Sequence, residues 1–123
     1  MAAVATLTPA RQQVEPPRRT GLELAPLRLG PVEVWPPVIL APMAGETGST
    51  LRILCRRQGA GMVVTELTSS IGLFHQNRRS LEYLRWTAEE SPLSAQLFGA
   101  DPEMMAQAAR MCCEAGADLI DIN

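Results

Sequence analysis

Four groups of residues in this chain have the side chains and the spacing to bind a polar ligand. They are Pro42-Met43-Ala44, Thr65-Glu66, Gln96 and Asn123, and each stands where a short apolar run ends. Gln and Asn can donate and accept hydrogen bonds at once, which suits the edge of a flat heterocycle such as a flavin or a pyrimidine. Taken singly, each residue has a plainer explanation as a core contact or a loop anchor. Their recurrence at four successive run ends is what indicates a binding site.

The elements that position these residues follow from the alternation of apolar runs with amphipathic stretches. Short, continuous apolar runs are typical of buried parallel strands. We expect such strands at residues 38–43, 62–67, 93–99 and 118–123. Function in α/β folds gathers at the carboxyl ends of parallel strands, so the four groups of polar residues are expected to converge there.

Two helices are expected between these strands. The first ends at Arg57, with Ser49 or Thr50 as its cap. Its apolar face is expected to consist of Leu51, Leu54 and Cys55. The second occupies residues 102–115, because Asp is a strong capping residue at position 101 and Pro suits the first helical position that follows.

Three segments complete the pattern. Residues 27–34 predict a short hairpin or a lead-in strand, which either plugs the floor of a barrel or covers the edge of a sheet. Residues 68–76 are expected to be a polar loop or a short helix. Residues 78–86 are compatible with a helix and with an extended connection.

The order of strands and helices predicts the α/β class, with repeated right-handed βαβ units on a parallel sheet. A (β/α)8 barrel has eight such units in about 250 residues, so this chain would supply the first four of a truncated barrel. The last apolar run ends at Asn123, where a catalytic loop would be expected to begin. A small open α/β sheet is the alternative, although neither G-x-G-x-x-G nor G-x-x-x-x-G-K-[ST] occurs.

The amino-acid composition argues against a membrane protein, a metal site and a strongly basic nucleic-acid-binding protein. The net charge of -2 gives no global signature of nucleic-acid binding. No apolar run approaches the length of a membrane span, and no signal peptide is visible, so a cytoplasmic protein without a membrane partner is expected. The three cysteines are an odd number and lack the spacing of metal ligands, so we expect no metal site. Residues 1–26, rich in Pro and Arg, are expected to be a disordered or loosely attached leader.

Several segments together resemble one family, the tRNA-dihydrouridine synthases, from about Leu27 to the last residue. The resemblance rests on Leu40-Ala41-Pro42-Met43-Ala44-Gly45, Leu54-Cys55-Arg56, Gly59-Ala60-Gly61, Thr65-Glu66, Gln96-Leu97-Phe98-Gly99-Ala100-Asp101-Pro102-Glu103 and Gly116-Ala117-Asp118-Leu119-Ile120-Asp121-Ile122-Asn123. It implies an FMN-binding (β/α)8 barrel, of which residues 27–123 would be the N-terminal half. It also implies that NADPH reduces FMN and that the flavin then reduces the C5–C6 bond of uridines in tRNA.

The same resemblance implies roles for individual residues. Pro42, Met43 and Ala44 match the strand end that lies against the isoalloxazine ring of FMN. Gln96 matches the amide that binds the polar edge of the flavin. Asn123 matches an amide near the flavin and the flipped uracil, and Glu66 is a further candidate for a substrate contact.

The resemblance also marks what to expect of catalysis. The family places a Gly-Cys-Pro segment, with the cysteine that protonates the uracil, just beyond the position of Asn123. No residue of this chain is therefore assigned as catalytic, and the chain alone is expected to be inactive. Cys55 and Cys112 are expected to be structural. Residues 46–51 depart from the family's usual sequence, whereas Arg52 keeps its place.

Two alternatives remain open at this stage. One is half of another FMN barrel, like a dihydroorotate dehydrogenase or an ene-reductase, which acts on a free small molecule. The other is a non-catalytic half-barrel that binds a partner or a second copy of itself. Residues 74–79 are a candidate contact for tRNA phosphate, or else a solvated loop. The oligomeric state is not determined by the sequence.

Overall fold

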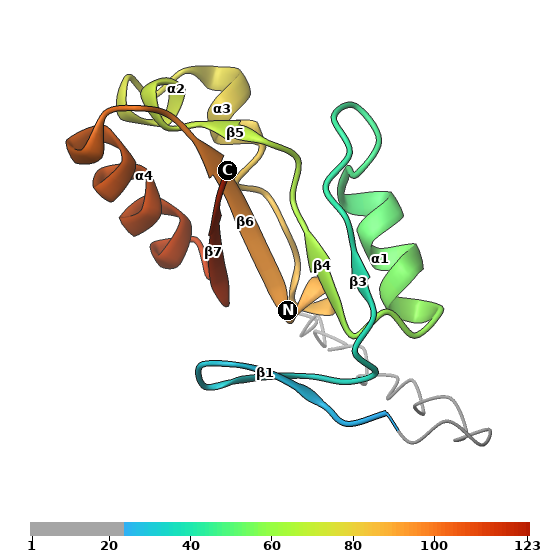
Figure 1. The fold of residues 1–123 in the computed structure, drawn as a ribbon. Coiled ribbons are helices and arrows are strands. Elements are labelled where there is room, and N and C mark those ends of the chain that lie inside the picture. Colours follow the sequence, from blue (N-terminus) through green and yellow to red (C-terminus); the bar gives the residue numbers. More distant parts are fainter. Residues whose placement is uncertain (1–23) are drawn as a thin grey trace, which may run out of the picture.

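The computed structural model describes residues 24–123, which form a parallel sheet with helices on one side and a small hairpin at one end (Figure 1). The leader expected at residues 1–26 falls almost entirely outside the described residues. The strands of the sheet are β3 Ile39–Leu40, β4 Met62–Val64, β5 Thr68–Ser69, β6 Leu93–Phe98 and β7 Leu119–Ile122. The helices are α1 Ser49–Arg57, α2 Ser70–Phe74, α3 Arg78–Glu82, the 3-10 helix η1 Ala88–Glu90 and α4 Pro102–Glu114.

All strand pairs of the sheet are parallel, which confirms the α/β class. The order is β3-β4-β6-β7, with β5 also paired to β6. Leu97 pairs with Thr68 on one side and with Ile122 on the other, so β5 lies on the same side of β6 as β4 does. Within residues 24–123, no further strand pairs with the outer edges of β3 and β7.

The second strand is shorter than the sequence predicted. Of the expected strand 62–67, only residues 62–64 form a strand, β4, and residues 65–67 separate it from β5, which begins at Thr68 beyond the predicted range. At this break the hydroxyl of Thr65 accepts a hydrogen bond from the backbone N–H of Gln96 at 3.0 Å. A side-chain oxygen thus replaces a backbone carbonyl in the sheet, and interruptions of this kind are common beside functional sites.

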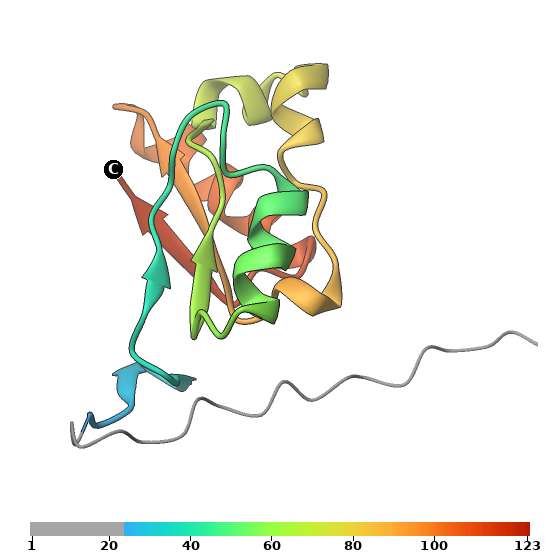
Figure 2. The same cartoon turned by 90° about the vertical axis from the view of Figure 1, so that its right-hand side faces the viewer.

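The core on the helical side of the sheet joins α2 and α4 to β6. Ala95 and Leu97 of β6 are buried against Leu73 of α2 and against Ala108 and Cys112 of α4. Figure 2 shows α1 and α4 on the same side of the sheet. Since successive side chains of a strand point to opposite faces, Gln96 points to the face that lacks these helices.

The hairpin consists of β1 Leu27–Leu29 and β2 Val32–Val34, paired antiparallel, which confirms the expected hairpin. It lies below the amino ends of the strands in Figures 1 and 2. Val34 is fully buried against Met62 and Val64 of β4, with Leu119 of β7 packed beside them. The face opposite the helices is therefore apolar at the amino end of the sheet.

Helix α4 begins as the sequence predicts. Oδ1 of Asp101 accepts a hydrogen bond from the backbone N–H of Met104 at 2.8 Å, and Pro102 is the first helical residue. This side chain satisfies one of the N–H groups that a helix leaves without an internal partner. The short-helix alternative for residues 68–76 holds in part, since α2 begins at Ser70 and Ser69 caps it.

Helix α1 differs from its prediction in two respects. Its N-cap is Gly48, which makes no side-chain cap, and Ser49 is already the first helical residue. Leu54, expected on the apolar face, is 52% exposed, whereas Arg52 is buried. Leu51 and Cys55, the other two residues of the expected apolar face, are half-buried, so the inward face differs from the prediction at Leu54 and at Arg52, whose burial accompanies its ion pair with Glu90.

Candidate functional site

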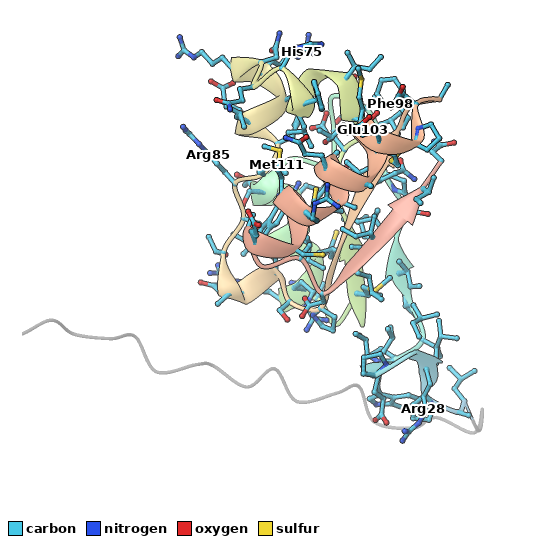
Figure 3. The ribbon with its side chains drawn as sticks, turned by 90° about the vertical axis from the view of Figure 1, so that its left-hand side faces the viewer. Arg28, His75, Arg85, Phe98, Glu103 and Met111 are labelled. Atoms are coloured by element: carbon cyan, nitrogen blue, oxygen red, sulfur yellow. The ribbon has the colours of Figure 1, made fainter. Side chains whose placement is uncertain are left out.

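Polar side chains surround the carboxyl ends of β4, β6 and β7, and those of Gln96 and Asp121 lie on the face opposite the helices. We call Thr65, Glu66, Gln96 and Asp121 the polar rim. In Figure 3, His75 and Phe98 mark the carboxyl end of the sheet, and Arg28 marks the hairpin at the other end. The same face thus changes from an apolar floor, built around Val34, to a hydrogen-bonded rim.

The side chain of Gln96 is the central contact of the rim. It is buried, with 8% of its surface exposed, and its Nε2 donates to Oδ2 of Asp121 at 2.7 Å. The two residues are direct partners in the ladder between β6 and β7, and partners in a ladder share a face. Asp121 was missed as a site residue, although its position two residues before Asn123 in a strand was a signal for it.

Thr65 connects the rim from β6 to β4. Besides accepting from the N–H of Gln96, its hydroxyl donates to the carbonyl of Glu66 at 3.0 Å. The backbone N–H of Thr65 donates to the carbonyl of Ser94 at 2.9 Å. These bonds fix the turn of chain that carries the Glu66 side chain away from the sheet.

Glu66 extends the rim to the first strand. Its Oε2 accepts a hydrogen bond from the backbone N–H of Gly45 at 2.8 Å. The loop that holds Gly45 is closed by Thr47, whose hydroxyl accepts from the N–H of Met43 and donates to its carbonyl, both at 3.0 Å. Side-chain hydrogen bonds therefore link the carboxyl ends of all four predicted strands to one another. Asn123 takes no part in these side-chain bonds.

The other predicted site residues, Pro42, Met43, Ala44 and Asn123, lie at the same edge of the sheet, and their side chains make none of these hydrogen bonds. Met43 is 42% exposed, Ala44 is exposed and Pro42 is half-buried, so this segment offers an apolar surface beside the rim. Asn123 is exposed, and its backbone N–H donates to the carbonyl of Leu97 at 2.9 Å. The carboxyl edge of the sheet therefore combines the polar rim with an adjacent apolar surface at residues 42–44.

A cavity of about 340 Å³ lies next to Glu66, between the start of α1 and α3. Glu66, Arg79 and Arg85 are among the residues that line it. A hydrogen bond that Arg79 donates to the side-chain oxygen of Tyr83 and, to a smaller extent, the negative charge of Glu66 raise the pKa of Arg79 above its ordinary value. Of the candidate tRNA-contact segment 74–79, Arg79 is thus the residue that faces this cavity.

Arg52, which keeps its family position, has a structural contact in this protein. Its Nε lies 2.5 Å from Oε2 of Glu90, and both side chains are almost fully buried. Arg52 also donates to the carbonyl of Thr47 at 2.6 Å, so the ion pair holds the loop after β3 in place. Glu90 additionally accepts from the hydroxyl of Ser49 at 2.6 Å. The sequence analysis assigned no role to Glu90.

Cys112, on helix α4, lacks the surroundings of a reactive thiol. Cys112 is fully buried, and burial, with a smaller contribution from Cys113, raises the pKa of its thiol to about 11. A thiol with so high a pKa is a poor nucleophile at neutral pH. Among residues 24–123, no group of three or more His, Cys, Asp or Glu side chains could hold a metal ion.

A parallel α/β sheet with a hydrogen-bonded polar rim at its carboxyl ends defines the class of α/β proteins that bind ligands at strand ends. Residues 39–123 match the family model described as "Dihydrouridine synthase (Dus)". Because this match covers more than half of the chain, the chain belongs to the dihydrouridine synthase family, and the resemblance found in the sequence is confirmed.

Curated relatives agree with the family model. The chain is 45% identical over 97 residues to "tRNA-dihydrouridine synthase B" of Xanthomonas axonopodis pv. citri, and 46% identical over 97 residues to the protein of the same name from Pseudomonas aeruginosa. Each match covers 79% of this chain and 29% of the relative. It is 38% identical over 115 residues to "Probable tRNA-dihydrouridine synthase" of Mycobacterium tuberculosis, covering 86% of this chain and 30% of that relative.

The chain therefore spans somewhat less than a third of the length of these relatives. Within the described residues, no helix has the length and apolar character needed to cross a membrane.

Proposed function

We propose that this chain forms the N-terminal half of the FMN-binding barrel of a tRNA-dihydrouridine synthase. The whole protein reduces the C5–C6 bond of uridine in tRNA, with NADPH as the reductant and FMN as the carrier. Family membership supports the reaction, and the hydrogen-bonded pair Gln96–Asp121 on the polar rim is the observation that supports a flavin site.

The barrel is the arrangement that the sheet favours. Residues 24–123 supply parallel strands in the order β3-β4-β6-β7, and the outer edges of β3 and β7 are unpaired within this part of the chain. In the proposed (β/α)8 barrel, further strands continue from β7 and close against β3. The hairpin around Val34 then forms the floor of the barrel, and residues 27–123 constitute its first half.

The residues of the rim fit FMN in chemical type. The polar edge of an isoalloxazine ring carries carbonyl acceptors on either side of an N–H donor, and a buried amide can match such an edge. Gln96 would bind this edge, and Pro42, Met43 and Ala44 would lie against the ring. Asn123 would lie between the flavin and the uracil. When bound, FMN supplies the hydride chemistry, whereas these residues orient the ring and exclude water.

The target uridine must leave its stack to reach the face of a flavin held at this rim. The rim of these four strands contains no cysteine that could protonate the uracil, because Cys112 and Cys113 belong to α4 and Cys55 belongs to α1. We therefore place the general-acid cysteine outside this chain, just beyond Asn123. The chain alone is proposed to be inactive and to lack a tight FMN site, and the whole protein is proposed to act in the cytoplasm, where its tRNA is.

The test uses the protein as its gene encodes it, with tRNA that lacks dihydrouridine and with NADPH. We expect bound FMN in the purified protein and formation of dihydrouridine, and Gln96→Ala is expected to weaken FMN binding. Turnover of dihydroorotate or of an enone, with no change in tRNA, would favour the other FMN barrels instead. A flavin-free, folded dimer would favour the non-catalytic half-barrel.

A separate experiment tests the proposal about this chain. Residues 1–123 expressed alone are expected to carry no stoichiometric flavin absorbance and to leave tRNA unchanged. Stoichiometric FMN in the purified chain would show that the second half of the barrel is not needed to hold the cofactor.

A further inference from the structure

We propose that Asp121 is a positioning residue that fixes the orientation of the Gln96 amide, so that Gln96 presents its carbonyl oxygen to the ligand. The inference rests on the proposed function, because it concerns how the same rim recognises a flavin. It concerns a residue to which neither the sequence analysis nor the family resemblance assigned a role.

The chemistry of the pair determines which way the amide points. An ionised carboxylate can only accept hydrogen bonds, whereas a Gln side chain has one accepting and one donating end. Nε2 of Gln96 lies 2.7 Å from Oδ2 of Asp121, so the donating end of the amide faces Asp121. The accepting oxygen, Oε1, must point to the other side.

Nothing in the described part of the chain competes for that oxygen. Within residues 24–123, the side chain of Gln96 makes its hydrogen bond through Nε2, and Oε1 has no partner. The side chain is nevertheless buried to all but 8% of its surface. Among the described residues, Oε1 is not one of the fully buried polar atoms that lack a partner, so it keeps access to the surface, which makes it the atom available to a ligand.

The backbone of Gln96 is also held, so the amide cannot easily move away from Asp121. Its N–H donates to the hydroxyl of Thr65 at 3.0 Å, and Asp121 is its direct ladder partner on β7. With both strands fixed, rotation of the side-chain amide by half a turn would bring Oε1 against the carboxylate. That orientation is repulsive, so a single orientation is selected.

The selected orientation defines a preference among ligands. An acceptor at Oε1 favours a ring edge that carries an N–H group, such as the N3–H of FMN, over the same ring with that hydrogen replaced by a methyl group. Loss of one hydrogen bond to a buried partner, with a steric clash in addition, corresponds to a preference of about tenfold or more. Without Asp121, the amide is free to rotate, and the preference is expected to fall.

The experiment measures the dissociation constants of FMN and of N3-methyl FMN for the protein as its gene encodes it. The wild-type protein is expected to prefer FMN by about tenfold or more. In Asp121→Ala, FMN is expected to bind about fivefold to tenfold more weakly and N3-methyl FMN nearly as before, so the preference collapses. Asp121→Asn, which keeps the shape of the side chain but can donate as well as accept, is expected to give an intermediate preference.

A matched control and a rescue separate this role from general stability. Asp118 directly precedes β7, at the opposite end of the strand from Asp121, and its Oδ2 accepts from the backbone N–H of Leu93 at 2.8 Å, so Asp118→Ala is expected to leave the preference unchanged. The double variant Gln96→Glu with Asp121→Asn reverses the pair, with Asn donating to Glu, and still presents an acceptor to the ligand. It is expected to recover the preference for FMN.

The outcomes distinguish this inference from the proposed function. Failure of the wild-type protein to bind FMN would overturn both. FMN binding and tRNA reduction by the wild-type protein, with an unchanged preference in Asp121→Ala and Asp121→Asn, would overturn only the positioning role of Asp121.

Discussion

Oε2 of Glu66 accepts a hydrogen bond from the backbone N–H of Gly45 at 2.8 Å, which ties the loop after the first strand to the end of the second. The two residues are far apart in the sequence but adjacent at the carboxyl edge of the sheet. Since the loop also contains Met43 and Ala44, this bond positions the segment proposed to lie against the flavin. Glu66 was predicted as a substrate contact, and that role remains a prediction beside the observed one.

Substitution of Glu66 separates the two roles. Glu66→Gln keeps an oxygen that can accept from Gly45, whereas Glu66→Ala removes it. If the main role is to hold the loop, Glu66→Ala should accelerate amide hydrogen exchange at residues 43–47 by about fivefold to thirtyfold, which corresponds to about 1–2 kcal/mol. Glu66→Gln should resemble the wild type in exchange and in turnover of tRNA. Equal loss of turnover in both variants, with unchanged exchange, would instead favour a charge-dependent contact with the substrate.

The buried ion pair between Arg52 and Glu90 predicts a large difference between two neighbouring glutamates. Glu90→Gln leaves the Arg52 guanidinium buried without a charged partner, which typically costs about 3–5 kcal/mol. Glu89, the neighbour of Glu90 in η1, pairs with Arg57 of α1. Both of these side chains are more than half exposed, so Glu89→Gln should cost about 0–1 kcal/mol. Urea denaturation of the two variants measures this difference.

Salt provides the control for this comparison. Surface pairs are screened by salt and buried pairs much less. The small effect of Glu89→Gln should therefore shrink further in concentrated salt, whereas that of Glu90→Gln should persist. Similar costs for the two variants would contradict the buried arrangement of Arg52 and Glu90.

The elements that could be predicted from the sequence are those specified by neighbouring residues. The start of α4 follows from Asp101 and Pro102, and its cap is the predicted one. The break between β4 and β5 could not be predicted, because it depends on a bond between Thr65 and Gln96, which are distant in the sequence. The burial of Arg52 likewise depends on Glu90, so its charge made the helix face look solvent-exposed.

In the candidate site, too, features set by neighbouring residues could be predicted, whereas a contact between distant residues could not. The strand-end position of Gln96 was readable, because a polar residue stood near the end of an apolar run. Its partner Asp121 was not recognised, since the pairing depends on the register between β6 and β7. Strand alternation alone would have placed Asp121 and Asn123 on one face, but only the register brings Asp121 opposite Gln96.

The adjacent cysteines 112 and 113 are predicted to differ in reactivity. Cys113 is exposed, whereas Cys112 is fully buried with a thiol pKa of about 11. Iodoacetamide at pH 8 should modify Cys113 in the folded protein and Cys112 only after unfolding, as peptide mass analysis can show. Rapid modification of Cys112 under native conditions would contradict its burial against β6.

The same pKa predicts how stability depends on alkaline pH. The thiol of Cys112 ionises near pH 9.0 when unfolded and near 11 when folded, so the unfolded state binds fewer protons between these values. The contribution of this thiol to the free energy of unfolding is therefore fully present below pH 9 and is lost as the pH rises through 11. The midpoint of urea unfolding should fall over this window, and Cys112→Ala should reduce the slope. An identical slope in that variant would assign the loss to other groups.

Gly99 is required by its distance from one side chain, and this gives a prediction with a rescue. A Cβ atom on Gly99 would lie 1.9 Å from Oγ of Ser70, so Gly99→Ala should destabilise the protein by about 1–3 kcal/mol. Oγ of Ser70 is buried and has no hydrogen-bond partner within residues 24–123, so Ser70→Ala alone should be nearly neutral. The double variant should recover the part of the loss that this contact causes, with a coupling of about 0.5–3 kcal/mol between the two sites, whereas the cost of placing Ala at φ +158° remains.

Gly61 is the matched control for Gly99. A Cβ atom there would lie 1.9 Å from the carbonyl oxygen of Pro36, which belongs to the backbone and cannot be removed by substitution. Gly61→Ala should therefore be destabilising with or without Ser70→Ala. Chemical denaturation of the three single and two double variants measures both cycles. If Gly99→Ala costs the same in the presence and absence of the Ser70 hydroxyl, the close approach of α2 to the end of β6 is not the reason for this glycine.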